Sequence, residues 1–368
     1  MSETVSGVVK SRANGAGVLR NPKLSFRADR SDVFVPPGLM RRLCEGAEVT
    51  GTARPGRRGA ELATVDSVCG LSLEEFERRT PFKRLTAIDP CDRFRLATGG
   101  DISMRIIDLV APIGKGTRAL IVSPPKAGKT MLLMEMTKAI QADDPKARVI
   151  VLLIDERPEE VTHFRRAVNA MVLASSIDQS SQEHIELSEL ALAYIRTELE
   201  VGRDVVVLVD SLTRMGRTFN LKSGGRGRGR TMSGGVDVGA LDVPRKFFGL
   251  ARNAEGGGSV TIVATALVDT GSRADQLIFE EFKGTGNSEI VLDRKLAEAR
   301  IFPALNIESS GTRKEERLHA PDDLARITQL RRVLLDRGPR EAMDILIELT
   351  RKYPTNEELL QNVPARRS

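Results

Sequence analysis

The chain has 368 residues, 40% hydrophobic and 29% charged, a composition typical of a globular protein that excludes a largely disordered chain. Lys and Arg total 56 against 50 Asp and Glu, so the net charge is +6, which favours a polyanionic partner. Aromatic residues are only 4%, fewer than expected for a protein that binds bases mainly by stacking. The length favours two or three domains.

Several further classes of protein are disfavoured by the sequence. The apolar runs are short, and none approaches the length that crosses a bilayer, so no membrane association is expected. The N-terminal residues lack the basic-then-apolar pattern of a secretory signal, and we expect a cytoplasmic protein. The three cysteines match no zinc-binding spacing and are interpreted as free thiols. The three histidines are scattered, which disfavours a histidine metal site or triad.

Residues 1–70 predict a small all-β domain. Short β-type runs are separated by Gly, Pro, Asn and Asp, which favours an OB-like barrel. The predicted strands are Val5–Val9, Ala16–Leu19, Val33–Val35, Glu48–Thr52 and Glu61–Val65. A barrel without any ligand remains an alternative, because this pattern alone carries no chemistry.

The rest of the chain predicts a connector, an α/β core and a helical tail. Residues 71–115 form the connector, and residues 116–320 alternate apolar strands with helical segments, which predicts a parallel sheet covered on both faces. The predicted core strands are Ala119–Val122, Val149–Ile154, Val205–Val209, Val260–Ala264 and Ile290–Leu292. Residues 321–368 contain three helical segments, separated by Gly338-Pro339 and Pro354.

A phosphate-binding loop is predicted at residues 123–130, SPPKAGKT, between a strand and a helix. Gly128 lets the backbone approach the phosphates, and Lys129 places a charge on the β and γ phosphates. Thr130 offers its hydroxyl to Mg²⁺. Ser123 stands where this motif usually has its first glycine.

Two carboxylates follow predicted core strands. Asp210 ends an apolar run in a Walker B pattern and would hold Mg²⁺ through water. Glu156 follows Val149–Ile154 and is suited to polarise an attacking water. The alternative is that these carboxylates only cap the following helices. Their position beyond the carboxyl ends of strands, beside a phosphate loop, favours a catalytic role.

Two late arginines are candidates for stabilising charge on a transferred phosphoryl group. Arg300 and Arg313 follow the last core strand, so either could face a neighbouring subunit. On the pattern alone, an ordinary surface arginine is the better interpretation of each.

Two glycine-rich basic segments complete the motifs. Residues 221–237 alternate Arg and Gly, and Asp269–Arg273 ends in another cation. Free amides and guanidinium groups suit contact with a phosphodiester backbone. A flexible, solvated loop is the alternative for residues 221–237.

These motifs together resemble one family, the bacterial transcription termination factor Rho, whose members are hexameric RNA-dependent ATPases of the RecA/F1 class. The resemblance runs from about Val5 to Val363. It is carried by PPKAGKT (124–130), LLIDERPEEV (152–161), VDSLTR (209–214), SGGVD (233–237), ATALVDTGS (264–272), EEFKGTGN (280–287) and SGTRKEE (310–316).

The resemblance implies a RecA-like P-loop ATPase core, a cold-shock-like RNA-binding barrel before it, and roles for individual residues. Glu156 is similar to the catalytic glutamate, Arg157 to a γ-phosphate sensor and Arg313 to an arginine finger acting on a neighbour, with Arg300 in support. The ATP site is implied to consist of Pro125, Lys126, Ala127, Gly128, Lys129 and Thr130, with Met131 and Phe302 clamping the adenine and Asp210 as the Walker B aspartate.

The RNA contacts that the resemblance implies lie in the barrel and two pore loops. The pore contacts are Arg230, Ser233, Gly234, Gly235 and Val236 in one loop and Arg273 in the other. In the barrel, Ala16 and Val18 stand where the family usually has two aromatics, while Arg20 and Phe34 remain as possible contacts. We therefore expect weaker base stacking in the barrel, and a form of the family without its N-terminal helical module.

The expected function is RNA-stimulated ATP hydrolysis by a homohexamer that uses ATP and Mg²⁺, moves along RNA and releases transcripts from RNA polymerase. Three alternatives remain open. The first is a related protein that moves on RNA without terminating transcription. The second is a non-catalytic RNA-binding ring, which the intact ATPase motifs disfavour. The third is a rotary-ATPase subunit, which the N-terminal barrel and basic loops disfavour.

Overall fold

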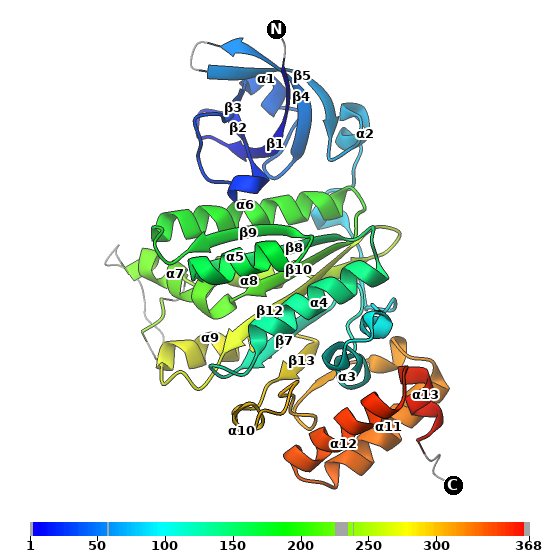
Figure 1. The fold of residues 1–368 in the computed structure, drawn as a ribbon. Coiled ribbons are helices and arrows are strands. Elements are labelled where there is room, and N and C mark those ends of the chain that lie inside the picture. Colours follow the sequence, from blue (N-terminus) through cyan, green and yellow to red (C-terminus); the bar gives the residue numbers. More distant parts are fainter. Residues whose placement is uncertain (1–2, 57–58, 225–234, 238, 364–368) are drawn as a thin grey trace.

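The computed structural model describes residues 3–56, 59–224, 235–237 and 239–363. Figure 1 shows a β-barrel at the N-terminal end, an α/β core in the middle and a group of helices at the C-terminal end. The predicted fold class is confirmed: a small barrel precedes a core built on a largely parallel sheet.

The barrel is closed in the strand order β1-β2-β3-β5-β4, because β1 pairs with both β2 and β4. Its strands are β1 (Glu3–Ser11), β2 (Gly17–Arg20), β3 (Val33–Val35), β4 (Glu48–Gly56) and β5 (Gly59–Val68). Two short helical turns lie between them, η1 (Pro22–Leu24) and α1 (Pro37–Met40). Alternate strand residues such as Val9, Leu19 and Leu62 fill the barrel interior.

A connector leads from the barrel to the core. Its elements are α2 (Leu73–Glu77), η2 (Phe82–Arg84), β6 (Ala87–Ile88), η3 (Leu96–Gly99) and α3 (Ile102–Val110). Helix α2 begins at a capping box, in which Ser72 and Glu75 each accept a backbone N–H of the other.

The core sheet has the strand order β14-β13-β7-β12-β10-β8-β9, with β11 and β6 attached at the side of β12. Strands β9, β8, β10, β12, β7 and β13 are parallel, whereas β14 runs antiparallel to β13. The strands are β7 (Arg118–Ser123), β8 (Arg148–Glu156), β9 (Met171–Ser176), β10 (Val205–Asp210), β11 (Arg252–Ala254), β12 (Ser259–Leu267), β13 (Ser288–Val291) and β14 (Gly311–Thr312).

Helices cover both faces of this sheet (Figure 1). Along β8, Val149, Val151 and Leu153 join one buried cluster, whereas the intervening residues join the cluster on the opposite face. This explains why the strand is apolar at every position. The core helices are α4 (Lys129–Asp143), α5 (Pro158–Ala167), α6 (Ser181–Glu200), α7 (Leu212–Gly224), α8 (Asp242–Phe248), α9 (Arg273–Lys283) and α10 (Arg294–Glu298).

The C-terminal helices are fastened to the core by one buried arginine. Arg105 of α3 donates to the carbonyls of Thr350 (2.6 Å) and Tyr353 (2.8 Å) and to Asn356 Oδ1 (3.1 Å). Its three acceptors lie where α12 ends and α13 begins, so it satisfies the final carbonyls of α12. The elements of this region are η4 (Glu315–Arg317), α11 (Pro321–Leu335), α12 (Pro339–Lys352) and α13 (Asn356–Gln361).

The barrel lies directly on α6. Gly46 has φ 87°, and a Cβ there would lie 2.2 Å from the carbonyl carbon of Ala193, so only glycine allows this approach. Lys10 of β1 pairs with Glu186 of α6 at 2.6 Å. Among the described residues, no helix is both long and apolar enough to cross a membrane.

Candidate nucleotide-binding and catalytic site

The loop between β7 and α4 has the geometry of a phosphate cradle. Lys126 and Gly128 have φ values of 64° and 90°, and Gly128 is the N-cap of α4. This conformation turns the backbone N–H groups of the loop toward the space before the helix, where the helix dipole also favours an anion. Ala127 is buried beneath the loop, and Ser123 Oγ donates to the Pro124 carbonyl at 2.9 Å.

Lys129 lies between the two carboxylates that the sequence singled out. Its ammonium forms an ion pair with Asp210 Oδ2 and lies 3.9 Å from Glu156 Oε2. Asp210 ends β10, and its other oxygen accepts from Thr265 Oγ1 of β12 at 2.9 Å. Glu156 and Asp210 end the adjacent strands β8 and β10, and Lys129 begins the helix that follows β7. They meet because the carboxyl ends of parallel strands lie at one edge of the sheet.

Glu156 is 1% exposed at the end of β8. Burial raises the pKa of its carboxyl, and the charge of Asp210 adds to the rise, against the opposing effects of the Arg157 N–H, Arg214 and Lys129. Oε1 accepts from the Arg157 N–H at 3.0 Å and from Arg214 at 3.1 Å. Oε2 is buried and receives no hydrogen bond among the described residues. A held carboxylate with one free oxygen is suited to orient a water molecule.

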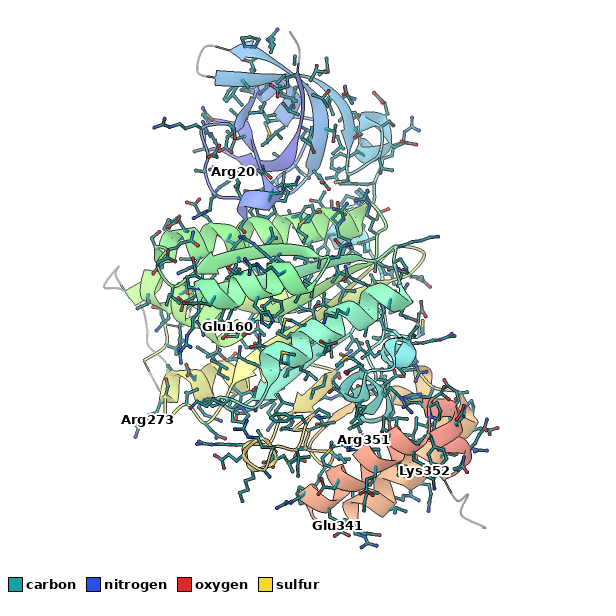
Figure 2. The ribbon with its side chains drawn as sticks, in the orientation of Figure 1. Arg20, Glu160, Arg273, Glu341, Arg351 and Lys352 are labelled. Atoms are coloured by element: carbon teal, nitrogen blue, oxygen red, sulfur yellow. The ribbon has the colours of Figure 1, made fainter. Side chains whose placement is uncertain are left out.

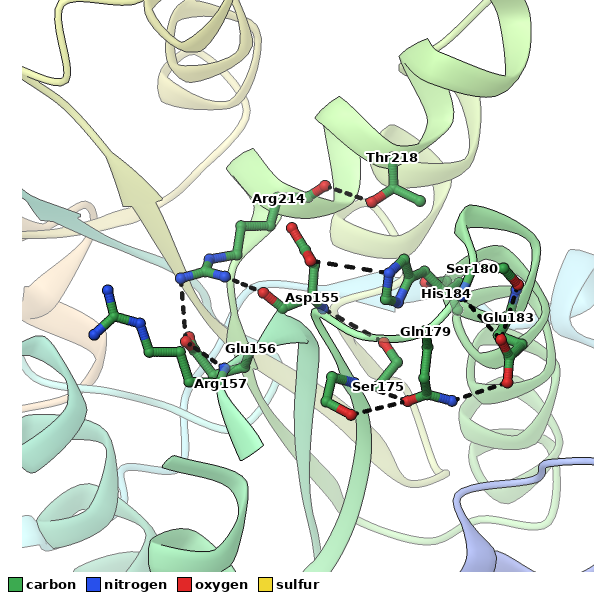
Figure 3. A network of polar contacts seen from close by, with 12 residues as sticks. Asp155, Glu156, Arg157, Ser175, Gln179, Ser180, Glu183, His184, Arg214 and Thr218 are labelled. Carbon is green, nitrogen blue, oxygen red and sulfur yellow. Dashed lines mark hydrogen bonds and ion pairs between the residues drawn. The ribbon is translucent and has the colours of Figure 1, made fainter. Parts of the chain in front are cut away.

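Arg214 was not foreseen as a site residue, although it belongs to the quoted VDSLTR motif. It projects from α7 and donates to the Asp155 carbonyl and to Glu156 Oε1 (Figure 3). Arg157 contributes its backbone N–H here, but its side chain is exposed and points away from the network around Asp155 (Figure 3).

Thr130 and Glu160 make a second contact that the sequence did not predict. Thr130 Oγ1 donates to Glu160 Oε2 at 3.1 Å, so the lone pairs of the hydroxyl oxygen stay available to a cation. Glu160 lies in the first turn of α5, where a carboxylate also interacts favourably with the helix dipole.

A pocket of about 450 Å³ extends from the phosphate loop. Met131 and Phe302, which line it, are 54% and 47% exposed, unusual values for large apolar side chains. Gly128, Asp101 and Ser103 also line this pocket. An apolar slot with a few polar groups has the character of a site for a nucleotide base.

A second pocket, of about 440 Å³, lies on the other side of Lys126. Pro125, Lys126, Arg294 and Arg300 line it, so Arg300 lies beside the phosphate loop of its own chain.

Arg313 lies far from the phosphate loop of its own chain. Its N–H donates to the Asn287 carbonyl at 2.7 Å, and the Asn287 N–H donates in turn to the Arg118 carbonyl at 3.0 Å. Arg313 therefore lies beside Arg118, the first residue of β7. The phosphate loop begins at the other end of β7, about 17 Å away along the strand. Its side chain is exposed. The structure does not bring Arg313 together with the other predicted catalytic residues of the same chain.

The predicted RNA contacts are only partly covered by the structure. Arg230, Ser233 and Gly234 lie outside the described residues. Gly235 is exposed and Val236 is buried in the core. Arg273, the first residue of α9, is exposed and projects from the edge of the core (Figure 2).

The outer face of the barrel offers one aromatic side chain at the expected positions. Ala16 and Val18 are 1% and 2% exposed, and Val18 pairs with the half-buried Phe34 of β3. Arg20 is itself mostly buried and pairs with Asp32 at 2.5 Å. The surface available for stacking is therefore small.

The described residues contain no group of three or more His, Cys, Asp or Glu placed to hold a metal ion. The site nevertheless suits Mg²⁺, which proteins often bind through one or two oxygen ligands together with substrate phosphates. Thr130 and Asp210 supply such oxygens, and Glu156 Oε2 beside them is a buried oxygen that receives no hydrogen bond from the described residues.

Comparison with known proteins identifies the family. A transcription termination factor Rho from Aquifex aeolicus is 46% identical over 98% of this chain and 85% of its own length. The chain belongs to the transcription termination factor Rho family. A Rho protein from Chromobacterium violaceum is 45% identical over 97% of the chain and 87% of its own length. Rho from Streptomyces lividans is 48% identical, but the chain spans only 48% of that protein.

The core of this Rho-family chain also matches a wider group of ATPases. The ATP synthase alpha/beta family, nucleotide-binding domain, matches residues 103–312, so the chain has the nucleotide-binding domain of an ATPase. A solved type III secretion ATPase of pathogenic bacteria shares the fold, with a TM-score of 0.64, 19% identity, and coverage of 85% of this chain and 93% of its own. EscN from enteropathogenic E. coli has a TM-score of 0.62 and 18% identity over 82% of this chain and 76% of its own.

We expect Lys129→Ala to lower ATP turnover by about 10²–10³-fold, the range for removing one preorganised charge-stabilising donor. The loss also leaves Asp210 and Glu156 without the cation between them. Steady-state phosphate release is the measurement. The matched control is Lys138→Ala, on the exposed side of the same helix, where Lys138 pairs with Glu135. Turnover of Lys129→Ala near that of this control would contradict the assignment.

Proposed function

We propose that this Rho-family chain forms a ring that hydrolyses ATP in response to RNA, moves along RNA and releases transcripts from RNA polymerase. The observation that carries the proposal is the 46% identity to a protein named transcription termination factor Rho over 98% of the chain. The ATP synthase alpha/beta match and the residues around Lys129 support the hydrolytic part.

Binding of ATP is assigned to the phosphate loop and the pocket beside it. The backbone N–H groups from Lys126 to Thr130 and the Lys129 ammonium would hold the phosphates, and the adenine would lie between Met131 and Phe302. Thr130 and Asp210 would hold Mg²⁺, the latter through water. The ion would neutralise charge on the β and γ phosphates.

Hydrolysis is assigned to the carboxylate of Glu156. Its Oε2 orients the attacking water, while Arg214 and the Arg157 N–H hold Oε1 in place. Arg157 is assigned to the γ-phosphate, and its exposed side chain leaves it free to swing toward a bound nucleotide.

The position of Arg313 supports a site shared between subunits. Since Arg313 is level with the start of β7, it cannot complete the site at the other end of that strand, but a neighbour's site can receive it. A closed ring repeats this head-to-tail contact at every interface, which agrees with a homohexamer.

RNA binding is assigned to residues 221–237 and 269–273, with Arg273 as the cation of the second loop. Electrostatic contacts of this kind hold single strands with little sequence preference. Arg20 and Phe34 of the barrel are assigned a lesser part, because little aromatic surface is available there.

The proposal is tested on a stalled transcription complex. RNA polymerase is halted on immobilised DNA with a long unstructured transcript, and the chain is added with ATP. We expect labelled RNA to appear in the supernatant with ATP, and none with Glu156→Gln. No release on any transcript, from a ring that hydrolyses ATP on RNA, would contradict the termination step.

A second candidate is a ring that moves on RNA without terminating transcription. The burial of Ala16 and Val18 favours it, because a barrel with little stacking surface captures a nascent transcript weakly. This candidate predicts RNA-stimulated hydrolysis and displacement of an annealed strand, with no release from the stalled complex. The likeness to secretion ATPases concerns the fold alone and favours neither candidate.

A further inference from the structure

A pocket of about 600 Å³ lies between the barrel and the core. Its barrel wall is formed by Ser6 of β1, Glu48 of β4 and the turn at residues 21–23. Its core wall is formed by Arg165 of α5 and residues 170–172, where β9 begins. The volume suits a ligand of the size of a nucleotide. The pocket beside the phosphate loop has none of these residues in its described lining, so the two sites are separate.

Two cations from different domains line this pocket. Lys23 belongs to the turn that follows β2, and Arg165 lies in the last turn of α5. Both side chains are exposed, and neither forms an ion pair with an acidic residue in the described part of the chain. Arg165 Nη2 donates to Ser25 Oγ at 3.2 Å, which leaves the other N–H groups of the guanidinium available to a ligand.

The edge strand β9 adds a backbone donor to the same pocket. The Ala174 N–H points away from β8, because it donates to Ser25 Oγ at 2.9 Å. The Ile177 N–H points toward β8, because it donates to the Glu156 carbonyl at 3.0 Å. Since the backbone groups of a strand alternate in direction, the Val172 N–H points the same way as that of Ala174. It has no acceptor among the described residues, and Val172 lines the pocket.

The acidic residue in the described lining already has partners of its own. Glu48 pairs with Arg148 at 3.3 Å and accepts a hydrogen bond from Tyr194 at 3.4 Å. The pocket therefore presents an ammonium, a guanidinium and a backbone N–H, without an acid of the described lining free to pair with them. A phosphate group is bound by this combination of donors.

The pocket also continues the barrel strand that ends at Arg20. Arg20 and Lys23 are three residues apart, so their Cα atoms are at most about 11 Å apart, a span of a few nucleotides. Ser25 has a φ of 52° and fastens the turn to the core through its bonds with Ala174 and Arg165. A single strand held at Arg20 therefore meets Lys23 first and Arg165 next.

We propose that this pocket binds a phosphate of single-stranded RNA where the strand leaves the barrel, with Lys23, Arg165 and the Val172 N–H as the donors. The inference rests on the proposed function, in which the barrel has a lesser part in RNA binding. The contact carries no sequence preference, because every nucleotide has the same phosphate. It adds affinity beside a barrel that offers little stacking surface, and it ties the strand to the ATPase core as well.

The test measures the affinity of the full ring for labelled poly(C) and a labelled mixed-sequence RNA, without ATP, over a range of salt concentrations. One phosphate contact on a single strand contributes about 0.7 to the slope of log affinity against log salt, or about fivefold in affinity between about 1 M and about 0.1 M salt. We expect Lys23→Ala and Arg165→Ala each to lower the slope by about 0.7 and the affinity by about fivefold at about 0.1 M salt.

Two further readouts separate this site from sequence-selective and pore contacts. The loss of affinity should be equal on both RNAs. In ATP hydrolysis, the RNA concentration for half-maximal stimulation should rise by the same factor, while the turnover at saturating RNA stays unchanged.

The matched control is Arg351→Ala. Arg351 is an exposed cation of α12, at the end of the molecule opposite the barrel (Figure 2), so its loss should change neither affinity nor slope. Arg165→Lys keeps the positive charge and should keep the slope. Should Arg165→Ala fail to form rings, Lys23→Ala decides, because the Lys23 side chain makes no hydrogen bond or ion pair with the described residues.

Two outcomes would overturn the assignment of this pocket to RNA. One is unchanged affinity in Lys23→Ala and in Arg165→Ala, which would leave the pocket to another occupant, such as a peptide strand on the edge of β9. The other is a loss of affinity with an unchanged salt slope, which would mean that the residues only support the fold. A failure of the proposed function would look different, because the unchanged chain itself would not bind RNA.

Discussion

Replacing Arg313 by alanine is expected to lower RNA-stimulated turnover by about 10³–10⁵-fold, the range for an arginine that stabilises charge on a transferred phosphoryl group. The backbone of Arg313 is held by β14 and Asn287, while its side chain is exposed, so the substitution removes an exposed cation and disturbs little packing. The measurement is steady-state ATP hydrolysis with saturating RNA. Arg317→Ala is the matched control, an exposed arginine of the same segment that pairs with Asp89, and should change turnover by less than about twofold.

Mixed rings test whether Arg313 acts on a neighbour. Subunits carrying Lys129→Ala are mixed with subunits carrying Arg313→Ala, each inactive alone. At an interface where the Arg313→Ala subunit supplies the phosphate loop and the Lys129→Ala subunit supplies the arginine, both residues are intact. ATP hydrolysis should return in proportion to the number of these interfaces. If Arg313 acted within its own chain, no site in the mixture would be complete and the mixture would stay inactive.

Glu156→Gln is expected to bind ATP within about threefold of the unchanged chain but to hydrolyse it about 10²–10⁴-fold more slowly. The amide has the shape of the carboxylate and can keep the hydrogen bonds at Oε1, but it cannot take a proton from water. Equilibrium binding of a fluorescent ATP analogue and single-turnover hydrolysis separate the two effects. Glu159→Gln, at an exposed glutamate three residues along, controls for the loss of one negative charge. Undiminished hydrolysis by Glu156→Gln would remove Glu156 from the mechanism.

The sequence predicted best those strands that are continuous runs of β-branched and other apolar residues. The strand Val33–Val35 was predicted with its observed bounds, and β10 extends the prediction only by Asp210, because continuous β-branched runs between turns favour strands strongly. Strand β9 (Met171–Ser176) was not predicted. Its second half is Ala and Ser, and it is the edge strand, where a short segment is stabilised by its neighbour rather than by its own composition.

Only those site residues that belong to local sequence motifs could be predicted. Lys129, Glu156 and Asp210 belong to local patterns beside strand ends, and the structure brings their side chains together. Arg214 and Glu160 could not be assigned, because their contacts depend on how α7 and α5 lie against the loop. The sequence could not show that Arg313 lies far from its own phosphate loop, because that distance depends on how β14 pairs with β13 and β13 with β7.

Control of hydrolysis by RNA is measured as steady-state ATP turnover without RNA, with poly(C) and with a mixed-sequence RNA. We expect RNA to stimulate turnover strongly. Equal stimulation by both RNAs would mean that the pore loops carry recognition, as the small stacking surface of the barrel suggests, and stimulation by poly(C) alone would mean that the barrel still selects cytosine. A ring that hydrolyses ATP but is stimulated by neither RNA would not be an RNA-controlled ATPase.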